Sequence, residues 1–350
     1  MSIFKKKSTE VISGDIANRE VEGLSQGQIV RRRFLRHRGA MVSLIVLGIT
    51  VLFVFSALDL SVGFIHYPGW WKYSITDQPD IRTNGCPPGL GGCPTISLNP
   101  FGAFGLGDHP FGQDDIGRDY FALVMRGAQR SILVMLIIGL VGGALGTIVG
   151  AVSGFYRGWV DSVLMRFTDF IITIPSIIIG SVIGYHFGNL GVTFLALYLG
   201  LFAWTGLSRL VRGEFLSLRE REFVDAAKVA GASNRRIIFK HILPNAVGVI
   251  IVAVTLIMSG AILLETALSY LGFGVVSPDV SLGLLISQYQ DSFTTRPWLF
   301  WYPGIFIILI ALSVNFIGDG LRDAFDPRQR RRISRKEKAA ARKSAVEARG

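Results

Sequence analysis

Six long apolar stretches constrain the fold of this 350-residue chain more than any other feature. A helix needs roughly 20 residues to cross a hydrocarbon core, whereas a transmembrane barrel shows alternating segments of ~10 residues. Only 17% of the residues are charged and 50% are hydrophobic, which argues against a soluble enzyme. The sequence therefore predicts an all-α membrane protein with six transmembrane helices, at 41–58, 131–152, 167–187, 192–210, 246–268 and 298–317.

The basic residues predict the orientation of these spans. Thirty of the 36 lysines and arginines lie in 1–40, 153–166, 208–244 and 319–350. By the positive-inside rule both termini are cytoplasmic, which agrees with an even number of spans. We therefore expect a cytoplasmic N-terminal segment 1–40 without a cleaved signal peptide, a six-helix domain 41–320 and a basic cytoplasmic tail 321–350. The six-helix domain contains an external insert at about 59–118 and a cytoplasmic loop at about 212–245.

The net charge of +11 lies beside the spans and comes with no nucleic-acid recognition motif, so it indicates contact with anionic membrane lipid and no nucleic acid. The chain contains no zinc-protease motif, no nucleophile elbow and no phosphate-binding loop, and its histidines lack ligand spacing. We expect no catalytic residue, no metal site and no nucleotide hydrolysis by this chain alone. The function classes that remain are a transporter and a channel.

Three residues in or near the spans and two cysteines in the external insert each have two interpretations. Arg166 and Asp169 are three residues apart, so they form either an interfacial ion pair or part of a proton relay. Glu265 lies deeper, and it either lines a pathway or contacts a neighbouring helix. Cys86 and Cys93 in the external insert are either joined in a short disulfide loop or remain free thiols.

Small residues and a proline predict how two of the spans pack. Gly142, Gly146, Gly150 and Gly154 follow at four-residue intervals, which produces a flat stripe that lets another helix approach closely. Pro175 removes one backbone donor from the third span and predicts a kink there.

The cytoplasmic loop is too polar to span the membrane and too patterned to be a linker. Residues 222–230 read as a short helix with small side chains, and Gly231 ends it in a left-handed conformation. Ser233 caps a second helix that runs to Leu243, and Pro244 starts the next segment. This pattern predicts a compact knob below the membrane that a partner groove can approach, or an amphipathic helix that lies on the lipid surface.

The same loop resembles the EAA loop of ABC importer permeases. Its pattern is Asp-Ala-Ala, three residues, Gly231, nine residues and His-Ile-Leu-Pro. The family pattern has Glu where this chain has Asp225, and Ile where it has His241. The first change preserves the charge, and Ile242 follows directly after the second.

Three further segments resemble the second, C-type permease subunit of the oligopeptide, dipeptide and nickel importer group. They are His-Pro-Phe-Gly-Gln-Asp-Asp-Ile-Gly-Arg-Asp-Tyr at 109–120, Glu-Thr-Ala-Leu-Ser-Tyr-Leu-Gly-Phe-Gly at 265–274 and Gly-Asp-Gly-Leu-Arg-Asp-Ala-Phe-Asp-Pro at 318–327. The resemblance covers about residues 29–332 and leaves the insert around 67–104 without a role.

This resemblance implies a type I ABC importer permease in a bacterial or archaeal cell membrane. Its partners are a sister permease in a heterodimer, two cytoplasmic ATPases that bind ATP and Mg, and an external substrate-binding protein; the chain itself carries no cofactor. The resemblance favours an oligopeptide or dipeptide substrate, with nickel or another small solute as the alternative, and a channel or ion-coupled carrier as the less favoured class. The residues expected to couple to the ATPase are Glu222, Asp225, Ala226, Ala227, Gly231, Ala232, Leu243 and Pro244.

Overall fold

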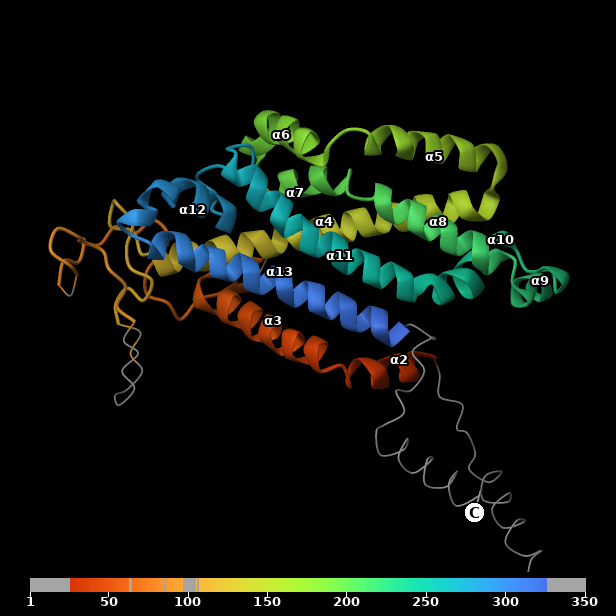
Figure 1. The fold of residues 1–350 in the computed structure, drawn as a ribbon, viewed down its shortest axis with the longest axis horizontal. Coiled ribbons are helices and arrows are strands. Elements are labelled where there is room, and N and C mark those ends of the chain that lie inside the picture. Colours follow the sequence, from red (N-terminus) through yellow and green to blue (C-terminus); the bar gives the residue numbers. More distant parts are fainter. Residues whose placement is uncertain (1–25, 63–64, 85, 97–104, 106, 326–350) are drawn as a thin grey trace, which may run out of the picture.

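The computed structural model describes residues 26–62, 65–84, 86–96, 105 and 107–325. Its long helices run side by side along one axis (Figure 1). The helices are α2 (Gln26–Phe34), α3 (Arg38–Ala57), α4 (Tyr120–Tyr156), α5 (Gly158–Ile172), α6 (Ser176–Phe187), α7 (Val192–Gly200), α8 (Thr205–Arg219), α9 (Glu222–Val229), α10 (Asn234–Arg236), α11 (Leu243–Tyr270), α12 (Leu282–Tyr289) and α13 (Trp298–Phe325). Residues 1–25 of the predicted N-terminal segment and 326–350 of the predicted tail lie outside the described residues.

The predicted spans are confirmed, and the third one is broken. Five helical segments are long and apolar enough to cross a membrane, and a bent pair makes a sixth if it counts as one span. This pair is α5 and the helical segment from Ser176 to Leu190, which meet at 77°. The break lies at Pro175, as the kink prediction expects, because proline lacks an amide hydrogen and disfavours helix at the residue before it.

The glycine stripe of α4 packs against α8, as predicted. A Cβ atom at Gly150 would lie 2.5 Å from the carbonyl oxygen of Ser208, and one at Gly154 would lie 2.8 Å from that of Arg212. At Gly146 it would lie 2.8 Å from the carbonyl oxygen of Trp204. The backbone of α8 therefore occupies the space that side chains on α4 would fill, which is the geometry of small-residue packing in membranes.

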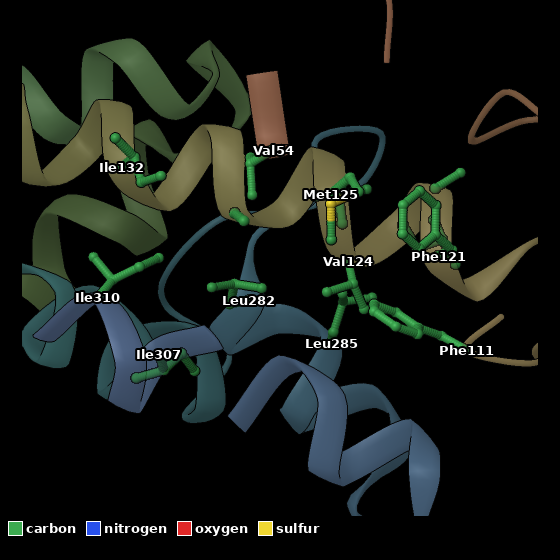
Figure 2. Packing of buried hydrophobic residues seen from close by; sticks show 14 of the residues in the cluster. Val54, Phe111, Phe121, Val124, Met125, Ile132, Leu282, Leu285, Ile307 and Ile310 are labelled. Atoms are coloured by element: carbon green, nitrogen blue, oxygen red, sulfur yellow. The ribbon is translucent and has the colours of Figure 1, made fainter. Parts of the chain in front are cut away.

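Buried side chains join the helices at both ends of the bundle. Figure 2 shows one cluster, in which Phe121 and Met125 of α4 pack with Leu282 and Leu285 of α12 and with Ile307 of α13. Sequence analysis did not predict α12, an eight-residue helix that Ser281 caps by accepting a hydrogen bond from the amide of Leu284. A second cluster lies at the end near α9.

The external insert is folded against the start of α4. It contains a short antiparallel hairpin, β1 (Leu60–Val62) and β2 (Ile65–Tyr67), while the other described elements are helices, as the predicted all-α class requires. The buried carboxylate of Asp119 caps α4 through the amide of Ala122 and accepts 2.7 Å from the indole of Trp71. Burial raises the pKa of Asp119, and His109 contacts the same carboxylate at 2.8 Å. Asp119 therefore fastens the insert to the membrane domain.

Replacing Gly150 by valine tests the packing of α4 on α8. Overpacking costs about 1–3 kcal/mol, and here the obstacle is backbone, which yields less than a side chain does. We expect Gly150→Val to lower the melting temperature of the purified chain, measured by tryptophan fluorescence in detergent. Gly206→Val in α8 is the control, because no atom lies within 4 Å of a Cβ there. Equal melting temperatures for the two variants would contradict this packing.

Candidate functional site

The knob that the sequence predicts below the membrane begins with α9, which ends in a Schellman motif. Gly231 has φ = +76°, the left-handed conformation that the sequence predicts. The amide of Gly231 donates to the carbonyl of Lys228 at 2.9 Å, and the amide of Ala232 donates to that of Ala227 at 3.0 Å. These two bonds satisfy carbonyl groups that a helix end leaves open, and they give the exit from α9 a defined geometry.

The two faces of α9 have different surroundings. Val224 and Ala227 face inward and pack in a cluster with Phe155 of α4 and Phe215 of α8. Ala226, Ala230 and Gly231 are exposed, and so are Glu222 and Asp225. Val229 is 91% exposed, which is unusual for a valine in a short helix. The exposed part of α9 therefore presents small side chains together with the apolar side chains of Val229 and, to a lesser extent, Phe223.

Two of the predicted contact residues are placed differently from expectation. Ala227 is only 9% exposed, because the helical period turns it toward the chain's own core. Leu243 is partly buried against the same cluster. Pro244 is exposed, and Ala232 is half-buried. Sequence analysis did not single out Val229 as an exposed apolar residue. A valine on the polar side of a short amphipathic helix is a pattern that could have indicated it.

The second predicted helix does not end before Pro244. Ser233 caps α10 as predicted, accepting from the amide of Arg236 at 3.4 Å, but a π-helix from Ile237 to Ile242 then leads directly into α11. A proline is tolerated in the first turn of a helix, because the amide it lacks has no partner there. The side chain of Asn245 donates 2.6 Å to the carbonyl of His241. The knob is thus continuous with the fifth span.

Side chains also tie the knob to the corner between α4 and α5. Arg219, at the end of α8, donates to the carbonyl of Phe155, and its guanidinium lies 5.4 Å from the centre of that ring. Glu220 forms an ion pair with Arg157, which has φ = +57° at the corner itself. The end of α8, directly before α9, is thus attached to the corner between α4 and α5.

Two ion pairs join α5 to α8 in the membrane domain. Arg212 contacts Asp161 through two hydrogen bonds of 2.6 Å, and Arg209 is paired with Asp169. The expected pair of Arg166 with Asp169 is therefore wrong. Residues three apart on a helix are neighbours, but Arg209 reaches Asp169 across the helix interface.

Glu265 lies at the centre of a buried hydrogen-bond network between α4 and α11. The hydroxyl groups of Ser131 and Ser269 donate to its two carboxylate oxygens at 3.1 and 2.7 Å. Ser131 accepts from the amide of Leu282 and Ser269 from that of Val275. Since Glu265 is fully buried, the structure places it in helix contacts rather than on an open surface.

The external insert holds the two cysteines. A disulfide joins Cys86 and Cys93, whose Cα atoms are 5.6 Å apart. In the part of the chain that the structure describes, no group of three or more histidine, cysteine, aspartate or glutamate side chains is arranged to hold a metal ion.

The described geometry is that of a multi-span helical bundle with a structured knob at one end. The family of binding-protein-dependent transport system inner membrane components matches residues 146–331, and the N-terminal transmembrane domain of oligopeptide transport permease C matches residues 25–88. The oligopeptide transport system permease protein OppC of Mycobacterium tuberculosis is 39% identical over 310 residues, covering 88% of this chain and 97% of that protein. OppC of Escherichia coli is 36% identical over 329 residues, covering 94% of this chain and all of its relative.

A solved structure is also similar. An inward-facing form of the MetNI methionine ABC transporter aligns with a TM-score of 0.49 and 18% identity, covering 58% of this chain and 96% of that one.

This chain belongs to the family of binding-protein-dependent transport system inner membrane components, and within it to the OppC-type permeases. The resemblance inferred from the four motifs is thereby confirmed. The protein is a non-catalytic, multi-pass inner-membrane subunit of a bacterial transport system.

Substitution of Glu265 tests the buried network. Glu265→Ala removes the acceptor of both serine hydroxyls, and each buried group left unsatisfied costs about 1–3 kcal/mol. We expect a clearly lower melting temperature for Glu265→Ala and a smaller decrease for Glu265→Gln, whose amide oxygen still accepts. Glu222→Ala, on the exposed face of α9, is the control. If Glu265→Ala melted like this control, the network would not stabilise the fold.

Proposed function

We propose that this chain is the permease subunit of an ATP-driven importer of oligopeptides or dipeptides. The names of its relatives support the peptide substrate. A nickel or other small-solute importer of the same group is the alternative. No cluster of metal-ligating side chains occurs among the described residues, which favours the peptide.

The single observation that carries this proposal is the exposed face of α9. Ala226, Val229 and Ala230 form a small, partly apolar surface on a helix whose opposite face is packed into the protein's own core. Small side chains let a partner groove approach closely. Asp225 stands beside this surface with its carboxylate 2.9 Å from Lys228. We assign the surface to contact with a cytoplasmic ATPase that binds ATP and Mg.

The proposed partners are a sister permease, two ATPase subunits and an external binding protein that delivers the peptide. Of the predicted coupling residues, Glu222, Asp225, Ala226 and Gly231 lie at the exposed surface, whereas Ala227 and Leu243 support it from inside. ATP binding can shift the spans from one arrangement to another only if the ATP-bound ATPases bind one arrangement more tightly than the other.

The proposed orientation places α9 and both termini in the cytoplasm. α9, α10, the end of α13 and α2 lie at one end of the bundle, and the insert and α12 lie at the other (Figure 1). The helix α2 carries Arg31, Arg32 and Arg33 in its last turn, which agrees with contact with anionic lipid at this end.

A series at Gly231 tests the coupling surface. Left-handed backbone costs an ordinary residue about 1–2 kcal/mol, whereas asparagine tolerates it. Among the described residues, apart from the two chain neighbours, no atom lies within 4 Å of a Cβ at Gly231. We expect Gly231→Val to reduce peptide uptake at least ten-fold and Gly231→Asn to retain most of it. ATP hydrolysis by the complex would no longer respond to the peptide-loaded binding protein.

Gly272 provides the matched control at the opposite end of the bundle. It has φ = +81° and equally open surroundings. Gly272→Val therefore imposes the same backbone strain away from the proposed contact. If both valine variants reduced uptake equally, strain alone would explain the loss and the ATPase contact would be refuted.

A further inference from the structure

The break in the third span exposes backbone polar groups inside the membrane domain. The 15 residues of α5 extend about 22 Å, so the break falls within a hydrocarbon core that is ~30 Å thick. Among the described residues, the carbonyl oxygens of Ile172, Thr173 and Ile174 accept no hydrogen bond, and the amides of Ser176 and Ile177 donate none. All five residues are exposed.

Contact with lipid would be unfavourable for the backbone groups at the break. Hydrocarbon satisfies no backbone donor or acceptor, so irregular backbone at membrane depth occurs only where protein buries it or where it lines a water-filled cavity. A cavity of about 260 Å³ lies at the break. Most of its lining is apolar, and its two polar side chains are those of Ser176 and Thr205. The fourth span is irregular beside this cavity, because turns over residues 201–204 separate α7 from α8.

Charged side chains on α5 lead to the same conclusion. Asp169 lies about 17 Å along the axis of α5 from its first residue, and its side chain is 46% exposed although it is paired with Arg209. Arg166 is exposed and has no ion pair or hydrogen bond with any described residue. Charged groups at this depth normally face a bundle interior or a water-filled cavity.

The position of α5 leaves this surface uncovered by the rest of the chain. α5 packs mainly on α4 and α8, while α3 lies at the opposite side of the bundle and packs on α13 and α4 (Figure 1). The charged and irregular positions are thus on one outer layer of the bundle.

We infer that the exposed side of α5, from Arg166 to the break at 173–175, lines the water-filled path through which the solute crosses the membrane. Unpaired carbonyls and amides there offer hydrogen bonds to any peptide backbone, independently of its side chains. This inference rests on the proposed importer function and identifies which surface of the chain performs it.

Labelling of single cysteines tests the inference, because a polar maleimide reacts with a thiol only where water reaches it. The parent is the assembled importer with Cys86→Ser and Cys93→Ser in this chain, reconstituted in liposomes. Thr173→Cys and Ser176→Cys are each treated with a sulfonated maleimide. We expect both to react at least ten-fold faster than the controls, and more slowly when transported peptide is present.

The controls are Ile49→Cys in α3 and Ile308→Cys in α13, which are 62% and 58% exposed and lie away from α5. The inference would be overturned if Thr173→Cys and Ser176→Cys reacted no faster than these controls. That result would mean that lipid or the sister permease covers the break. Peptide uptake by the same parent reports on the proposed function separately. If uptake is intact but the cysteines do not react, only the assignment of α5 to the path is refuted. If the wild-type importer shows no ATP-dependent peptide uptake, the proposed importer function is refuted.

Discussion

The close contact between α4 and α8 is the interaction on which the rest of the structure depends. Glycines on α4 let the backbone of α8 approach until a single added methyl group at Gly150 would meet a carbonyl oxygen at 2.5 Å. In a membrane, where lipid removes the hydrophobic gain of helix association, such close packing supplies much of the attraction.

Short connections with defined geometry join α9 to the neighbouring helices. Arg219 and Glu220 bind the α4–α5 corner, the Schellman motif at Gly231 sets the exit from α9, and the π-helix joins the knob to α11 without a flexible joint. Buried Glu265 holds α11 against α4 toward the other end. The break at Pro175 lies in the third span, whose first half, α5, packs on α4 and α8 and whose second half, α6, packs on α7 and α11.

Local patterns in the sequence predicted much of this arrangement. The left-handed Gly231, the cap at Ser233, the kink at Pro175 and the glycine stripe all depend on nearest neighbours along the chain, which the sequence displays directly. The partner of Asp169 and the inward side of Ala227 depend on which helices meet, and spacing along one helix does not contain that information. The small hairpin and α12 were missed because short elements in external segments carry little periodicity.

Cross-linking at α9 in native membranes is the most direct test of the central claim, that this knob contacts the ATPase. A cysteine replaces Val229, whose side chain is 91% exposed, and a short bifunctional thiol–amine reagent is applied. The account predicts a product that contains an ATPase subunit, with a yield that changes when ATP is bound. Tyr185→Cys in α6, a helix that lies away from α9 (Figure 1), is 74% exposed and should form none. Free labelling of Val229→Cys by a bulky maleimide, with transport and ATP hydrolysis still coupled, would contradict the account.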